Sequence, residues 1–256
     1  MAVLCAVSTD VATIVIDDPS TKNALTVTDR ATLAQLLAEL DLRDDVGVVV
    51  LRGANGTFCS GGNIREFGRL ADESAALRYA REVAQPVFRS MKSISKPTIS
   101  VVQGSAAGAG MFLALAADVC IADSEAVFSA SQLQLGVPPD WGGMWLLPRL
   151  VGAARARAIA LRPRPIPAPT AHQWGLIAEC VPCSGLELAL KEWCDALSAL
   201  PAGAVHLTRR GLDISPLMGS DDFLAYEMAA IAATAGGDEH RRHVANYQVR
   251  GKGLKE

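Results

Sequence analysis

The chain has 256 residues, of which 50% are hydrophobic and 20% charged, and its formal net charge at pH 7 is -3. A chain of this length and composition can bury a large hydrophobic core, which excludes an intrinsically disordered protein. The small negative charge, with no basic stripe, argues against a nucleic-acid-binding surface, and six cysteines spread through apolar stretches are typical of reduced thiols in a cytosolic protein.

Apolar runs of strand length alternate with helical stretches through the first 150 residues. In chain order, this pattern predicts strands at 11–17, 46–53, 97–102 and 119–122, and helices at 28–43, 73–92 and 107–117. Such alternation is typical of an α/β fold. The run VGVVVL within the second strand has no polar side chain, so we expect helices to cover both faces of the sheet there.

A mainly helical region follows residue 150, and we expect a core over 1–200 and a separate helical region over 201–256. The C-terminal helices carry more apolar positions than a thin appendage could bury alone, so we expect them to pack against another subunit. The N-terminus MAVLCAVSTD lacks the basic segment of a secretory signal, and the apolar stretch 98–117 predicts a strand, a turn and a buried helix. We therefore expect a cytoplasmic protein without a membrane span.

Two stretches with almost no bulky side chains each follow a predicted strand. One is GSAAGAG at 104–110 and the other is FCSGGN at 58–63. A helix that begins with Gly and Ala leaves its first N–H groups unpaired and open to close approach, which suits a negatively charged oxygen. Taken alone, each stretch is more simply interpreted as a tight turn where two chain segments cross. Neither matches a glycine-rich phosphate-binding loop.

Four motifs, taken in order, resemble the enoyl-CoA hydratase/isomerase family, also called the crotonase superfamily. They are Asn23-Ala24-Leu25, the segment from Thr57 to Phe67, the segment from Lys96 to Asp118, and the GVPPDWGG loop at 136–143 with the helix after it. The resemblance covers nearly the whole chain. It implies an α/β fold built as a crotonase-like spiral of strand-strand-helix units, followed by a C-terminal helical region that forms trimers and pairs of trimers.

The same resemblance implies a site that binds a coenzyme A thioester and stabilises its enolate. Members of the family hold the thioester oxygen with two backbone N–H groups, and the matching positions here are Gly62 and Ala109. Because coenzyme A is part of the substrate, we expect no separate cofactor and no metal. The residues expected to contact the substrate are Lys22, Ala24, Leu25, Ser60, Gly62, Ile64, Phe112, Gln132 and Trp141.

The chain departs from the family at both positions where hydratases carry a catalytic glutamate. Phe112 and Gln132 stand at these positions, and neither side chain can act as an acid or base near neutral pH. We therefore expect hydration to be absent or weak. One carboxylate, Asp140, lies in a loop similar to that of related isomerases in which an acidic residue moves the proton. Its apolar neighbours Pro139 and Trp141 predict a raised pKa for its carboxyl group.

The preferred interpretation is thus a double-bond isomerase of enoyl-CoA that uses Asp140 as its acid and base. Other interpretations stay open at this point. Asp140 also suits a structural role as a cap of the loop before the two glycines that follow it. A chain without both glutamates also fits a non-catalytic acyl-CoA-binding or regulatory protein, or a thioester hydrolase or decarboxylase.

Overall fold

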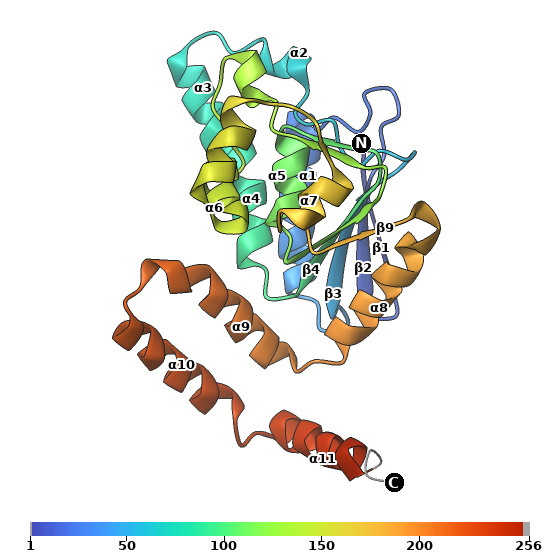
Figure 1. Ribbon diagram of the computed structural model, residues 1–256, viewed down its shortest axis with the longest axis vertical. Coiled ribbons are helices and arrows are strands. Elements are labelled where there is room, and N and C mark those ends of the chain that lie inside the picture. The colour runs from blue at the N-terminus through green and yellow to red at the C-terminus, as the bar shows by residue number, and fades with distance from the viewer. Residues whose placement is uncertain (1, 253–256) are drawn as a thin grey trace.

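The computed structural model of the protein describes residues 2–252, and a mainly parallel sheet forms the centre of this part of the chain (Figure 1). The sheet has the strand order β1-β2-β3-β4-β6-β9, and β1 is antiparallel to β2 whereas the other neighbours are parallel. Its strands are β1 Val3–Ser8, β2 Val11–Ile16, β3 Val48–Gly53, β4 Thr98–Val102, β6 Val119–Asp123 and β9 Glu179–Val181. A smaller sheet has the order β5-β7-β8, with β5 Ser105–Ala107, β7 Val127–Ser129 and β8 Ile166–Pro167.

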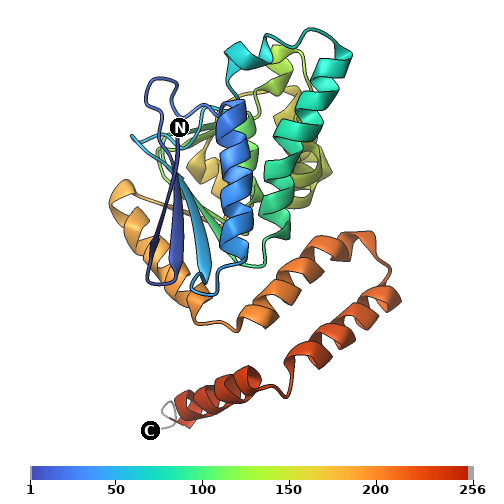
Figure 2. The ribbon, with the colours of Figure 1, turned by 180° about the vertical axis from the view of Figure 1, so that it is seen from behind.

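Helices cover both faces of the main sheet. The body of the molecule contains α1 Val27–Asp41, α2 Ile64–Phe67, α3 Glu73–Tyr79, a π-helical turn Ala80–Ala84, α4 Gln85–Ser93, α5 Ala109–Ala116, α6 Gly143–Leu161, α7 Ala168–Gln173 and α8 Leu186–Ser198. Seen from behind, α1 and α4 lie side by side against one face (Figure 2). The C-terminal helices are α9 Ala202–Ile214, α10 Ser220–Thr234 and α11 Asp238–Lys252. Within the described residues, no helix is both long and apolar enough to cross a membrane.

Strand β3 shows why its sequence is apolar at successive positions. Val49 and Leu51 belong to the large core cluster beneath the helices on one face, whereas Val48 and Val50 belong to a second cluster that includes Leu186 of α8. Side chains alternate between the faces of a strand, so a strand covered on both sides needs apolar residues throughout. The prediction of helices on both faces is confirmed.

The longer predicted elements lie close to their expected positions, and the differences have local causes. The helix expected at 107–117 begins at 109, because 105–107 pairs with β7 as a short strand. The helix expected over 73–92 is interrupted by the π-helical turn at 80–84. Strands β1, β5, β7, β8 and β9 were not predicted, and most of them are only two or three residues long.

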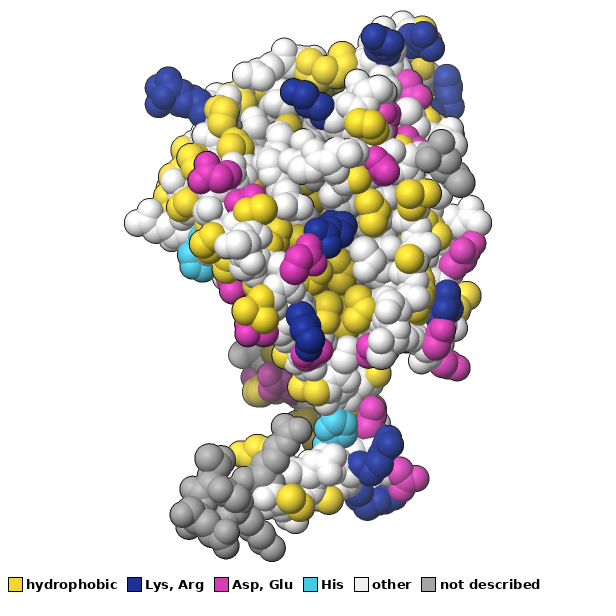
Figure 3. Space-filling view, turned by 90° about the vertical axis from the view of Figure 1, so that its right-hand side faces the viewer, with side chains coloured by type: hydrophobic (Ala, Val, Ile, Leu, Met, Phe, Trp, Pro, Cys, Tyr) yellow, Lys and Arg dark blue, Asp and Glu magenta, His cyan; other side chains and the backbone are white. Residues whose placement is uncertain are grey.

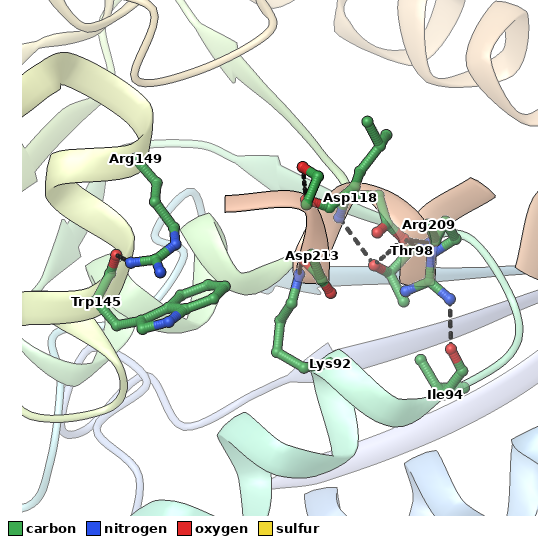
Figure 4. Close-up of polar contacts among 10 residues, drawn as sticks. Lys92, Ile94, Thr98, Asp118, Trp145, Arg149, Arg209 and Asp213 are labelled. Atoms are coloured by element: carbon green, nitrogen blue, oxygen red, sulfur yellow. Dashed lines mark hydrogen bonds and ion pairs between the residues drawn. The ribbon is translucent and has the colours of Figure 1, made fainter. Parts of the chain in front are cut away.

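Helix α9 is anchored to the body by two ion pairs (Figure 4). Arg209 Nε lies 2.8 Å from Asp118 Oδ2, and Lys92 Nζ lies 2.9 Å from Asp213 Oδ1. The Arg209 guanidinium also donates a hydrogen bond to the carbonyl of Ile94. The predicted boundary at residue 200 falls between α8 and α9, but α9 remains fixed to the body by these contacts.

Helices α10 and α11 extend away from the body and expose apolar side chains. No described residue of α10 is buried, and its exposed side chains include Leu224, Met228 and Ile231. Figure 3 shows the C-terminal part as a narrow extension below the body, and on this face acidic and basic side chains are interspersed. An apolar helix surface of this kind favours contact with another protein surface.

Candidate active site

The two side-chain-poor stretches lie against each other in the fold. The Cys59 N–H donates to the Ser105 carbonyl at 3.0 Å, and the Ala107 N–H donates to the Cys59 carbonyl at 2.9 Å. A methyl group placed on Gly61 would lie 3.5 Å from the backbone nitrogen of Ala109. The loop before α2 and the start of α5 therefore form one continuous backbone surface.

Close packing explains why these stretches are rich in glycine. A Cβ atom on Gly110 would overlap the carbonyl oxygen of Cys59. Gly61 and Gly108 have φ angles of 110° and 53°, which residues other than glycine rarely adopt. The interpretation as tight turns where segments cross is confirmed, and it is compatible with a second role in binding.

The Gly62 and Ala109 N–H groups stay available for a ligand. Gly62 forms a parallel bridge with Leu25, in which the hydrogen bonds use Gly61 and Asn63 instead. Ala109 is the first residue of α5, where an N–H has no acceptor within the helix. Among the residues that the structure describes, neither group donates a hydrogen bond inside the protein.

These two donors line a cavity of about 80 Å³. Other residues that contribute to its wall include Arg30, Gln132, Asp140 and Trp141. The predicted substrate contacts Ser60 and Ile64 lie there as well. Ligand sites in proteins usually measure roughly 300–1,000 Å³, so the cavity in this state is smaller than an acyl chain requires.

Asp140 points its carboxylate at Gln132. Its Oδ1 accepts a hydrogen bond from Gln132 Nε2 at 3.2 Å. Burial raises the pKa of Asp140, while the hydrogen bond from Gln132 and the positive charge of Arg30 oppose part of that rise. The predicted direction of the pKa shift is confirmed, and Trp141 is 4% exposed, as a desolvating neighbour should be.

The loop-capping role of Asp140 is not supported by its hydrogen bonds. Helix α6 begins after Gly142 with no side-chain cap, and the Gly143 N–H donates to the backbone carbonyl of Asp140, not to its carboxylate. The two glycines are required by packing instead. A Cβ on Gly142 would overlap the ring of Phe88, and one on Gly143 would lie 2.6 Å from the ring of Phe112.

Arg30 is a site residue that the sequence analysis missed. Its side chain is 1% exposed, Nη2 donates to the Leu25 carbonyl at 2.9 Å, and Nη1 donates to the Tyr79 hydroxyl. The guanidinium carbon lies 5.0 Å from the ring centre of Tyr79 and 5.7 Å from that of Trp141. A Cβ on Gly62 would lie 2.5 Å from Nη2, so the guanidinium packs directly against one of the two donors.

A signal for this residue exists in the helix pattern. Arg30 precedes Leu33 by three positions and Leu37 by seven, and both leucines are buried in the core. Residues at these spacings share one face of a helix, so the arginine had to be buried with them.

Four of the predicted substrate contacts do not line the cavity. Phe112 is fully buried, and its ring packs against Gly143 in the core, so its contact with the substrate stays a prediction. The remaining three are Lys22, Ala24 and Leu25. The Lys22 carbonyl accepts the Ser60 N–H at 3.0 Å, and the Leu25 N–H donates to the Gly61 carbonyl at 2.8 Å, so these two contact residues of the cavity wall.

Comparisons with known proteins agree on one family. The model of the enoyl-CoA hydratase/isomerase family matches residues 6–212. A protein of Rhodobacter capsulatus named a probable enoyl-CoA hydratase is 40% identical over 69% of this chain and 67% of its own length. The 1,2-epoxyphenylacetyl-CoA isomerase of Escherichia coli is 32% identical over 82% of this chain and 81% of its own.

A solved structure shows the same fold over almost the whole chain. The enoyl-CoA hydratase of Bacillus anthracis superimposes with a TM-score of 0.91 over 98% of this chain and 97% of its own, at 24% identity. The spiral α/β fold with C-terminal helices that the sequence predicted is confirmed. The chain thus belongs to the enoyl-CoA hydratase/isomerase family, within the crotonase superfamily.

Proposed function

We propose that the protein is an acyl-CoA enzyme that shifts a double bond within an enoyl-CoA, with Asp140 as its acid and base. The observation that carries this proposal is the presence of Asp140 in the same cavity as the Gly62 and Ala109 N–H groups. Among the described residues of the cavity wall, Asp140 is the only carboxylate. A relative named as an isomerase of another acyl-CoA is consistent with this chemistry.

The proposed reaction moves one proton between two carbons of the acyl chain. Asp140 takes a proton from the carbon next to the thioester carbonyl, and the electrons of that C–H bond pass to the thioester oxygen. The N–H groups of Gly62 and Ala109 hold this oxygen, and each such donor contributes on the order of 3 kcal/mol. Asp140 then returns its proton to the far end of the extended enolate, which leaves the double bond one position closer to the thioester.

The same wall disfavours the addition of water. Hydratases of the family use two glutamates to add water, and these stand at the positions of Phe112 and Gln132 in this chain. The first position is occupied by Phe112, whose side chain is buried in the core. At the other position, the Gln132 amide donates to Asp140, so it orients the carboxylate but takes no proton itself. One carboxylate suffices for a proton shuttle between two carbons, which favours isomerisation over hydration.

The first test compares the two reactions on the purified protein. We expect a 3-enoyl-CoA to be converted to its 2-enoyl isomer, whereas hydration of crotonyl-CoA should be negligible. Asp140 must be ionised to accept a proton, so the isomerisation rate should fall as the pH drops through the pKa of Asp140. Because burial raises that pKa, this acid limb should lie above the usual carboxyl range. Ultraviolet absorbance of the conjugated product measures both the rate and its pH profile.

Two results would contradict the proposal. Rapid hydration of crotonyl-CoA would show that other groups activate water. Tight binding of acyl-CoA without turnover of any 3-enoyl-CoA would instead favour a non-catalytic acyl-CoA-binding protein, which was one of the alternatives left open by the sequence.

We also propose that the chain associates with itself through its C-terminal helices, as a trimer or a pair of trimers. The exposed apolar side chains of α10 support this proposal, because such a surface is costly to leave in water. Light scattering should give three or six times the chain mass of 26.9 kDa. Replacing Met228 and Ile231 together by Glu should lower that mass. The control Leu42→Glu should not, because Leu42 is also exposed but lies at the C-terminal end of α1. A monomeric wild-type protein would reject the proposal.

A further inference from the structure

The buried guanidinium of Arg30 lacks an ion-pair partner in the described part of the chain. No carboxylate lies within 4.0 Å of it, and its Nε has no hydrogen-bond acceptor, although the side chain is 1% exposed. A buried charge without a partner is strongly unfavourable, and an arginine stays protonated at any pH at which proteins are folded. The position of Arg30 therefore calls for an opposite charge nearby.

Two groups in the cavity can carry a negative charge close to this guanidinium, one from the protein and one from a bound substrate. One is the Asp140 carboxylate, which shares the cavity wall with Arg30. The other is the thioester oxygen of a substrate bound at Gly62, against which Arg30 Nη2 packs. Of the titratable residues in the described wall, only Tyr79 remains, and its hydroxyl accepts a hydrogen bond from Arg30 Nη1.

We propose that Arg30 is a positioning residue that balances charge during the isomerisation proposed above, first opposite the ionised Asp140 carboxylate and then opposite the thioester enolate at Gly62. This inference rests on the proposed function. The proton passes from the acyl carbon to an Asp140 oxygen, and the electron pair of the broken C–H bond leaves its charge on the thioester oxygen. Arg30 keeps its own proton throughout.

The benefit of this arrangement is that the cavity never holds a net charge. Before the transfer, one cation faces one carboxylate, and after it the same cation faces one enolate. Charges interact more strongly where protein replaces water, so a fixed cation in the wall that carries both sites favours both states. Hydrogen bonds to Leu25 and Tyr79 hold the guanidinium in place, so no rearrangement accompanies the transfer.

The test compares neutral and charged replacements of Arg30. Arg30→Gln and Arg30→Met both remove the charge, and Met avoids leaving an unsatisfied polar group, so one neutral variant that folds is sufficient. Either should move the acid limb of the isomerisation rate to higher pH and lower the rate at neutral pH on the order of a hundredfold. Arg30→Lys keeps the charge and should keep the acid limb near its wild-type position. As a control, Arg155→Gln removes an arginine that lies 5.9 Å from the Trp174 ring outside the cavity, and it should change neither quantity.

A second measurement needs no substrate. The infrared carboxyl band that disappears in Asp140→Asn identifies Asp140, and its titration should shift to higher pH in the neutral Arg30 variants but not in Arg30→Lys. If the wild-type protein isomerises nothing, the proposed function fails while this titration still tests the pairing of Arg30 with Asp140. An Asp140 band and an acid limb that stay in place in a folded neutral variant would overturn the inference, because Arg30 would then be purely structural.

Discussion

Replacing Asp140 by Asn should lower the rate of enoyl-CoA isomerisation by roughly two to four orders of magnitude. The amide keeps the shape of the carboxylate and still accepts a hydrogen bond from Gln132, but it cannot take the proton. Affinity for acyl-CoA should therefore persist. Steady-state kinetics with a 3-enoyl-CoA and calorimetric binding of a saturated acyl-CoA measure the two properties on the same protein.

The stability of the same variant gives an independent check. Burial raises the pKa of Asp140 in the folded protein, so its ionised form is less stable there than in the unfolded chain. The contribution of this group to folding is largest at low pH and is lost as the pH rises through the raised pKa. Asp140→Asn should thus remove this fall in melting temperature between acid pH and pH 7, whereas loss of a structural cap would lower the melting temperature at every pH.

A matched control separates the role of Asp140 from that of any buried carboxylate. Asp123 is also buried, at the end of β6, and its Oδ1 accepts the Glu125 N–H at 2.9 Å outside the cavity. Asp123→Asn should leave the isomerisation rate close to that of the wild type. Equal rates in Asp140→Asn and the wild-type protein would remove Asp140 from the reaction.

Ala109→Pro should lower turnover by roughly two to three orders of magnitude, because it removes one of the two N–H groups proposed to hold the thioester oxygen. Loss of a single such donor typically costs two to three orders of magnitude in rate, roughly 3–4 kcal/mol. Ala109 is the first residue of α5, a position where proline suits a helix because that N–H has no helical acceptor. The fold should therefore tolerate the change, which circular dichroism and thermal unfolding will check.

The companion variant Ala109→Gly keeps the N–H and should keep most of the activity. Together the two variants separate the backbone donor from the small side chain. Unchanged turnover in a folded Ala109→Pro protein would show that the thioester oxygen is held elsewhere.

Periodicity in the sequence was sufficient for four of the six strands of the main sheet and for the helices between them. The apolar runs of β2, β3, β4 and β6 are long enough to be distinguished from helical patterns. Strands β5, β7 and β8 are not, because two or three residues carry no period and their pairing depends on segments that are distant in sequence. The interruption of the helix at 80–84 likewise has no sequence pattern that we could identify.

The site was predicted unevenly for reasons that lie in its packing. Gly62, Ala109 and Asp140 were found because family motifs mark them, and all three line one cavity. Phe112 was named because it stands at the position of a family glutamate, and the helical pattern gives no check on that prediction because every described residue of α5 is buried. Arg30 was missed because a charged residue on a helix is usually expected to face water. The buried leucines on the same face of the helix show that this arginine is buried with them.

The small size of the cavity sets a limit on how quickly a ligand can enter it. A cavity of about 80 Å³ is smaller than ligand sites in proteins usually are, so we expect part of the wall to move before an acyl chain binds. The wall includes Trp141, whose φ of 52° is unfavourable for a bulky residue, so we expect the loop around it to be the part of the wall that moves. When movement of the cavity wall precedes binding, the observed association rate stops rising with ligand concentration and levels off at the rate of that movement. Evolution of faster capture in this chain would then act on the loop around Trp141, leaving Gly62, Ala109 and Asp140 unchanged.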